Sequence, residues 1–151
     1  MDATLDNFLH RLPVMAGLNE TALQYLGGLA AEERYTAGSL ILREGEPGER
    51  VFFICEGRVR VVKDHGALEP VVLAEMGAGD YFGEMSLVES VARSASVVAV
   101  EPARVFTLKS VNFYKLYLKQ PDQYGIVVLN IARDLSRRLR RLDDRFVAIS
   151  H

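Results

Sequence analysis

The stretch Gly79-Asp80-Tyr81-Phe82-Gly83-Glu84-Met85-Ser86-Leu87, followed after a short gap by Arg93-Ser94-Ala95-Ser96-Val97, interrupts the strand-like pattern of the middle of the chain. A glycine before a short helical stretch leaves backbone N–H groups unpaired at the positive end of a helix, which suits an anion. Arg93 and the Ser94 hydroxyl suit a phosphate, whereas Glu84 suits a pair of sugar hydroxyls. These residue types favour a site for a small ribose phosphate. The alternative is a turn with a surface ion pair between Glu84 and Arg93.

Short strand-like runs surround this stretch and are separated by turn residues such as Glu44-Gly45-Glu46-Pro47-Gly48. Strand character begins at Tyr35, and successive runs lie about 8–14 residues apart, which is typical of an antiparallel sandwich or barrel. The runs are residues 39–43, 51–55, 58–62, 70–74, 94–100 and 104–108.

Helical periodicity appears at both ends of the chain. Apolar residues recur every three or four positions up to Pro13, and Asn19 stands where the cap of a second helix is expected, ending near Ala31. After Ser110 we expect a short helix over 111–118 and a long helix from about Pro121 to Val147. The predicted fold is α+β but mainly β: an antiparallel sandwich with N-terminal helices, a short internal helix and a long C-terminal helix.

The long helix carries an apolar seam with steps of three and four residues and a single stutter at Leu139. At about 40 Å it would be as long as the domain, so its distal half has little to cover. This favours a parallel homodimer through the helix, and the alternative is that the seam packs on its own sandwich. Several arginines between Arg137 and Arg145 are expected to interact favourably with the negative, C-terminal end of the helix dipole. The seam comprises Tyr124, Val128, Ile131, Leu135, Leu139, Leu142, Phe146 and Ile149.

Composition sets the broad class. The chain has 151 residues, of which 49% are hydrophobic and 25% charged, with a net charge of −2. This predicts an ordinary globular domain and argues against broad nucleic-acid binding. No apolar run approaches the ~20 residues of a membrane helix, and the first six residues do not form a secretory signal. Cys55 is the only cysteine, so a cytoplasmic location is expected.

No arrangement of residues predicts catalysis. The three histidines, His10, His65 and His151, are scattered without the spacing of metal ligands. No nucleophile triad, pair of carboxylates or phosphate-binding lysine loop is visible, so we expect no enzyme activity, no metal and no resident cofactor.

Phe82-Gly83-Glu84-Met85-Ser86-Leu87 with Arg93-Ser94-Ala95-Ser96-Val97 resembles the phosphate-binding cassette of the cyclic nucleotide-binding domains. That family includes bacterial catabolite activators, protein kinase A regulatory subunits and cyclic nucleotide-gated channels. Gly38, the 44–46 turn, Gly57 and Gly79-Asp80 stand at similar spacings, so the resemblance covers about residues 18–145. It implies a jelly-roll domain over 1–151, with a helical segment 1–34, a β-roll 35–110 carrying the cassette 79–97, and helices in 111–151.

The resemblance also implies a role for each matching residue of the cassette. Arg93 would pair with the exocyclic oxygens of a cyclic phosphate, and Ser94 would donate to them. Backbone N–H groups near Met85 and Ser86 would complete the cradle. Glu84 would accept from the ribose 2′-OH, next to Gly83, which lets the backbone approach closely.

Three further positions complete the predicted site. Val61 and Leu73 fall where the family lines its pocket with apolar residues, and a plain core role is the alternative for both. Arg138 stands with Leu139 where the catabolite activators place a Thr-Ser pair over the base. Arg138 could stack on a purine or belong to a solvated helix face, and the choice of base stays open.

These observations predict a stand-alone sensor of cAMP, in preference to cGMP, that passes ligand binding to a partner protein. No helix-turn-helix follows the long helix, so no DNA-binding domain is expected. One alternative is a ligand-independent dimerisation module of the same fold. Another is a sensor of a different effector such as haem, which the scattered histidines disfavour.

Overall fold

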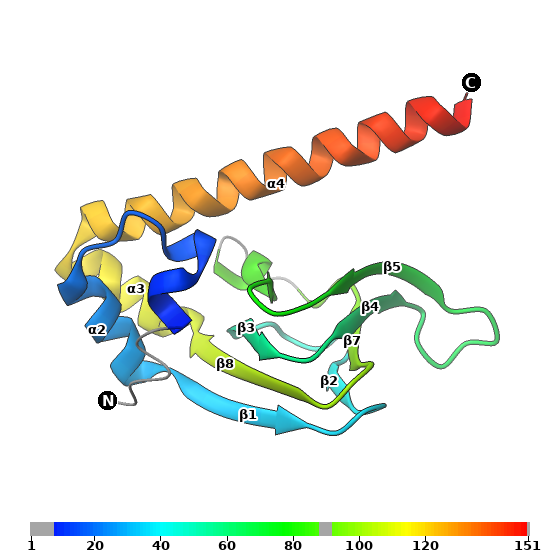
Figure 1. The fold of residues 1–151 in the computed structure, drawn as a ribbon, viewed down its shortest axis with the longest axis horizontal. Helices are drawn as coiled ribbons and strands as arrows, with labels where there is room; N and C mark the ends of the chain where they lie inside the picture. The colour runs from blue at the N-terminus through cyan, green and yellow to red at the C-terminus, as the bar shows by residue number, and fades with distance from the viewer. Residues whose placement is uncertain (1–7, 88–91, 151) are drawn as a thin grey trace.

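Eight strands form two antiparallel sheets in the computed structural model, which describes residues 8–87 and 92–150 (Figure 1). One sheet has the strand order β1-β8-β3-β6 and the other has the order β2-β7-β4-β5. Each sheet therefore joins strands from distant parts of the chain. The strands are β1 (Ala31–Tyr35), β2 (Leu40–Leu42), β3 (Arg50–Glu56), β4 (Val59–Lys63), β5 (Val71–Met76), β6 (Tyr81–Phe82), β7 (Ser96–Ala99) and β8 (Ala103–Lys109).

Helices lie before and after the strands, as the periodicity predicts. The Asn19 side chain accepts from the Ala22 N–H at 2.8 Å and thereby caps the second helical segment. The short internal helix is present as a single 3₁₀ turn, η2, at the start of the cassette. The helical elements are η1 (Pro13–Met15), α2 (Glu20–Leu29), η2 (Glu84–Leu87), α3 (Ser110–Lys119) and α4 (Pro121–Ser150).

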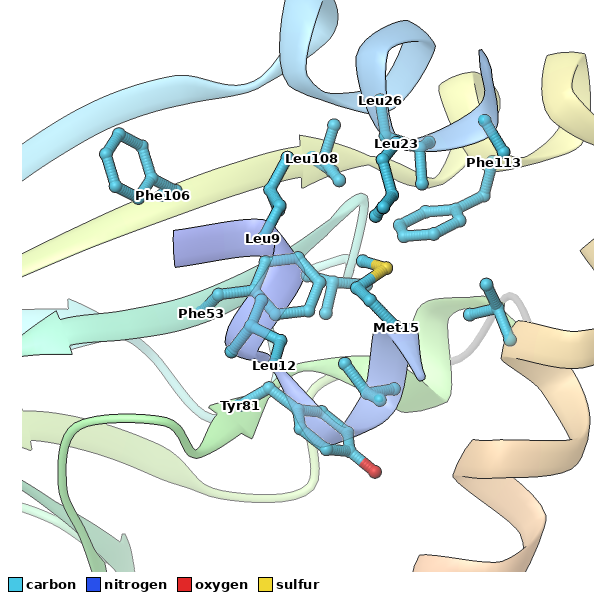
Figure 2. Packing of buried hydrophobic residues seen from close by; sticks show 14 of the residues in the cluster. Leu9, Leu12, Met15, Leu23, Leu26, Phe53, Tyr81, Phe106, Leu108 and Phe113 are labelled. Carbon is cyan, nitrogen blue, oxygen red and sulfur yellow. The ribbon is translucent and has the colours of Figure 1, made fainter. Parts of the chain in front are cut away.

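Strand β3 separates two hydrophobic cores because its apolar residues alternate between the two faces of the sheet. Phe52 and Ile54 face the opposite sheet, and Phe52 stacks on its cross-strand neighbour Phe82 of β6, with ring centroids 4.9 Å apart. Val51 and Phe53 face the helices instead. Figure 2 shows this second cluster, which includes Phe53 and Phe106 of the sheet together with side chains of η1, α2 and α3. A strand buried on both faces reads as the continuous apolar run seen at 51–54.

The first strand begins earlier than predicted. Strand β1 starts at Ala31 and pairs along its length with β8, from Ala31 opposite Thr107 to Tyr35 opposite Ala103. The prediction that residues 1–34 are helical is therefore wrong for 31–34. The segment Ala31-Glu32-Glu33-Arg34 is polar because β1 is an edge strand that is mostly solvent-exposed, so no apolar alternation marks it.

Helix α4 is three residues longer than predicted and ends at Ser150. Its last turn contains no basic residue. The interaction of a charge with the helix dipole falls off within the last turn, so the expectation that the dipole explains the arginines up to Arg145 is wrong. None of the helices among the described residues is long and apolar enough to cross a membrane.

Candidate functional site

A cavity of about 420 Å³ lies beside the cassette, between strands of the second sheet, η2 and α4. It is lined by every predicted site residue except Leu73. Residues 88–91 of the predicted cassette lie outside the described residues. The lining residues among the predictions are Val61, Phe82, Gly83, Glu84, Met85, Ser86, Arg93, Ser94 and Arg138.

Leu73 lies at a register shift of β5. Val61 pairs with Ala74 but the next residue, Val62, pairs with Val72, which leaves Leu73 without a cross-strand partner. Leu73 is 51% exposed and lines a separate hollow against α4, together with Leu142. The structure therefore brings Leu73 neither to the cavity nor into the core.

Arg93 enters the cavity without a carboxylate partner. Its Nη2 donates to the Arg50 carbonyl at 2.8 Å and its Nη1 donates to the Gly83 carbonyl at 3.2 Å, while its buried Nε has no hydrogen-bond partner. No ion pair joins Arg93 to a carboxylate among residues 8–87 and 92–150. Burial, with a smaller effect of the nearby Arg50 charge, lowers the pKa of the guanidinium. A half-buried cation held only by carbonyls is suited to receive an anion.

The turn at residues 44–48 holds Arg93 in place. The Gly45 N–H donates to the Arg93 carbonyl at 2.9 Å, and the Arg93 N–H donates to the Glu46 carbonyl at 2.8 Å. A Cβ on Gly48 would lie only 2.9 Å from the Arg93 Cζ. Sequence reasoning recognised this turn but missed that Gly48 packs against the cassette arginine. Only the pairing of two distant segments reveals that contact.

Gly83 has a backbone requirement as well as a steric one. Its φ is +83°, a conformation that favours glycine, and a Cβ there would lie 2.8 Å from the Arg50 carbonyl oxygen. Because the Gly83 and Arg50 carbonyls both accept from Arg93, any larger residue at 83 would disturb the position of the guanidinium.

Glu84 forms an ion pair with α4. Its side chain is buried, with 7% of the residue exposed, and its Oε1 accepts from the Arg138 Nη1 at 3.2 Å. Arg138 also reaches Asp134 at 2.9 Å, and its guanidinium lies over the Tyr81 ring at 5.3 Å from the centroid. The solvated-face interpretation of Arg138 is therefore wrong. The alternative of a surface ion pair between Glu84 and Arg93 is not what the structure shows either.

Tyr81 makes a second connection between this region and α4. Its hydroxyl donates to the Asp134 Oδ2 at 2.7 Å. Burial, together with the hydrogen bond to the Asp134 carboxylate, raises the pKa of Tyr81. Residues on both sides of Gly83 are thus tied to one turn of the long helix.

The serines and Met85 differ in their availability to a ligand. The Ser86 hydroxyl donates to the Gly83 carbonyl at 2.8 Å and accepts from the Ser110 hydroxyl at 2.9 Å, so it serves the internal structure. Met85 is exposed at the rim. The Ser94 hydroxyl makes no hydrogen bond within the described residues, whereas the Ser94 carbonyl accepts from Lys63 at 2.8 Å. Ser94 is the free hydroxyl beside Arg93.

Comparison with known proteins gives a consistent result. A family model described as the cyclic nucleotide-binding domain matches residues 32–120. The cyclic AMP receptor protein of Thermus thermophilus is 37% identical over 109 residues, covering 72% of this chain and 49% of that protein. The cGMP-dependent protein kinase, isozyme 1, of Drosophila melanogaster is 34% identical over 127 residues, covering 79% of this chain and 16% of that protein. The chain thus spans half or less of the length of these two relatives.

A solved structure shows the same architecture. The cyclic nucleotide-binding domain from Methylobacillus flagellatus superposes with a TM-score of 0.81 and 26% sequence identity, covering 95% of this chain and 81% of that one. The predicted jelly-roll sandwich with flanking helices is confirmed by this likeness and by the two four-stranded sheets.

Proposed function

This chain belongs to the cyclic nucleotide-binding domain family, and we propose that it binds a purine nucleoside 3′,5′-cyclic monophosphate and passes the binding event to a partner protein. We propose cAMP in preference to cGMP. The observation that carries the proposal is Arg93, a half-buried guanidinium with no carboxylate partner among the described residues and with an open cavity beside it.

In the proposed complex, Arg93 binds the exocyclic oxygens of the cyclic phosphate. Its guanidinium matches two phosphate oxygens through parallel charge-assisted hydrogen bonds, which a lysine ammonium cannot reproduce. The free Ser94 hydroxyl lies on the same wall of the cavity and donates to the same group. A cyclic phosphate carries one negative charge, which complements the charge of Arg93.

Glu84 accepts from the ribose 2′-OH in this proposal. One carboxylate oxygen is held by Arg138 at 3.2 Å, which fixes the orientation of the group and leaves its second oxygen for the sugar. Arg138 is then a positioning residue for Glu84 rather than a direct partner of the base. The apolar side chains of Val61, Met76 and Val97 supply a wall against which a flat purine packs.

Transmission of the signal follows from the same contacts. Glu84 and Tyr81 flank the phosphate-binding backbone and are bound to Arg138 and Asp134 of α4. A ligand that shifts Glu84 therefore acts directly on the long helix. We propose that α4 in turn forms a homodimer through its distal apolar residues, which the domain itself does not cover.

The test is cAMP binding measured by calorimetry on the wild type and Arg93 variants. Arg93→Ala is expected to cost about 2–5 kcal/mol of binding free energy, the range for truncating one partner of a buried charge pair. Arg93→Lys should recover only part of this loss. Arg140→Ala, which removes an exposed arginine of α4 outside the cavity, is the matched control and should bind like the wild type.

Two outcomes would overturn the proposal. Undiminished cAMP affinity in Arg93→Ala would remove the cassette from the mechanism. The absence of any binding of cAMP or cGMP by the wild type would favour the ligand-independent module. An absorption spectrum of the purified protein tests the haem alternative.

A further inference from the structure

A further hollow adjoins the cassette cavity at Arg138, which lines both. It has a volume of about 370 Å³ and is enclosed by three segments: the η1 region, the turn before β6, and one face of α4. The Asn130 amide donates to the Val14 and Ala16 carbonyls at 2.9 Å each and so fastens η1 to α4 at the edge of the hollow. Neither Arg93 nor Ser94 lines it. We call it the arginine hollow, after Arg133, Arg137, Arg138 and Arg141 in its wall.

Three of these arginines have no internal partner. Arg133, Arg137 and Arg141 are solvent-exposed and make no hydrogen bond or ion pair within residues 8–87 and 92–150. They follow one another at intervals of four residues, so they lie on neighbouring turns of one helix face. Like charges at this spacing disfavour an isolated helix, and the helix dipole does not compensate because α4 continues for at least two further turns.

The acidic residues of the hollow are already engaged. Asp134 accepts from the Tyr81 hydroxyl at 2.7 Å and pairs with Arg138 at 2.9 Å. The Asp80 carboxylate accepts from the Gly77 N–H at 2.9 Å. Arg138 is already paired with Asp134 and with Glu84, which lies outside the hollow. The positive charge of the site therefore comes from Arg133, Arg137 and Arg141, which outnumber the remaining carboxylate, Asp80.

We propose that the arginine hollow binds a phosphate dianion, supplied either by inorganic phosphate or by a small phosphomonoester, at Arg133, Arg137 and Arg141. The positive excess of the site favours an anion, and guanidinium groups are well suited to phosphate oxygens. The small volume of the hollow favours a small molecule over an extended polyanion. This site is additional to the proposed cyclic nucleotide site, and the two adjoin at Arg138, which also lines the cassette cavity.

The experiment is an NMR titration of the ¹⁵N-labelled 151-residue chain with inorganic phosphate, at constant ionic strength and a pH at which phosphate is a dianion. We expect saturable shifts of the amides at 79–81 and 130–141. The double variant Arg133→Gln/Arg137→Gln should weaken phosphate binding by about tenfold or more. Arg140→Gln removes a neighbouring arginine that does not line the hollow and should change binding by less than about twofold.

Three results would contradict the proposed phosphate site. The proposal fails if no saturable shift is seen, if Arg140→Gln weakens binding as much as the double variant, or if the shifts lie only at 82–86 and 93–94 and vanish in Arg93→Ala. If the double variant still binds cAMP, the loss of phosphate binding has left the proposed cyclic nucleotide site intact. A parallel titration with glycerol 3-phosphate distinguishes a phosphomonoester, which would bind more tightly than inorganic phosphate, from the free ion.

Discussion

The two halves of α4 share one apolar repeat but have different surroundings. In the first half, Ile131 of the seam and the neighbouring Val127 are 4% and 1% exposed because they pack against the helical core, whereas Val128 of the seam is 39% exposed. In the second half, Leu139 and Phe146 are 62% and 71% exposed. Figure 1 shows why: α4 begins beside α2 and α3 and ends far from them. Periodicity identifies the apolar face of a helix, but the path of the helix relative to the rest of the domain decides how much of that face is covered.

The boundary between the halves lies near Arg138. Leu135 still packs against the helical core, whereas Leu139 does not. Arg138 itself is paired with Glu84 at the edge of the cavity. Both interpretations of the apolar seam therefore describe part of the helix: the first half packs on its own domain, and the second half is left for the proposed partner copy.

The largest expected effect comes from the second half. Leu139→Lys with Leu142→Lys should weaken the proposed homodimer by about a thousandfold or more, since each leucine buried in a dimer contributes about 1.5–3 kcal/mol. Both residues are exposed in the single chain, so folding should change little. Sedimentation at several protein concentrations, with thermal unfolding in parallel, measures both quantities.

The control for this double substitution is Leu118→Lys on α3, an equally exposed leucine away from the distal end of α4. It should leave self-association unchanged. A wild-type protein that sediments as a monomer at every concentration would refute the dimer. A dimer that survives the double substitution would place the interface elsewhere.

In the first half of α4, a substitution should lower the stability of the fold. Ile131→Ala is expected to lower the free energy of unfolding by about 2–5 kcal/mol, since it removes a buried side chain from a packed core. Val128→Ala on the adjacent turn is the matched control, and it should cost less than about 1 kcal/mol because Val128 is 39% exposed and so loses less buried surface. Equal losses in chemical denaturation would show that the division of the helix is wrong.

Most of the fold could be predicted because its strands carry local signals. Runs such as 51–55 and 104–108 are apolar and bounded by turn residues, and both lie within observed strands. Strand β1 had no such signal because an exposed edge strand needs no apolar face. Strand β6 has two residues, too few to show a period, and is recognised only by its pairing with Phe52 and Phe53.

The sequence of the cassette predicted only part of the candidate site. The residues from Phe82 to Ser86 and Arg93 line one cavity, as expected. Their partners were not predictable, because the contacts of Arg93 with Arg50 and of Glu84 with Arg138 join distant segments. Side-chain partners across a fold depend on the register of sheets and the path of a helix, neither of which has a local pattern.

Arg138 lies at the boundary between the two halves of α4, where it pairs with Glu84. Arg138→Gln should weaken cAMP binding by about tenfold, because Glu84 loses the charge-assisted bond that orients it. Discrimination against 2′-deoxy-cAMP should shrink in Arg138→Gln and vanish in Glu84→Ala, measured by calorimetry. Unchanged discrimination in Arg138→Gln would show that Arg138 does not position the carboxylate for the ribose.

An effect of similar size is expected at Tyr81, whose hydroxyl links the cassette region to the first half of α4 at Asp134. Tyr81→Phe should lower the free energy of unfolding by about 1–2 kcal/mol at pH 8, the scale of a hydrogen bond to a charged acceptor. Burial and the Asp134 carboxylate raise the pKa of Tyr81 in the folded state above its unfolded value of about 10. The folded state then holds the phenolic proton more tightly, so this stabilisation is complete below pH ~10 and is lost as the pH rises further. The difference in unfolding free energy between wild type and Tyr81→Phe should therefore be constant from pH 7 to 9 and narrow at higher pH. A difference that stays constant through the alkaline range would exclude a role for the Tyr81–Asp134 hydrogen bond in holding α4.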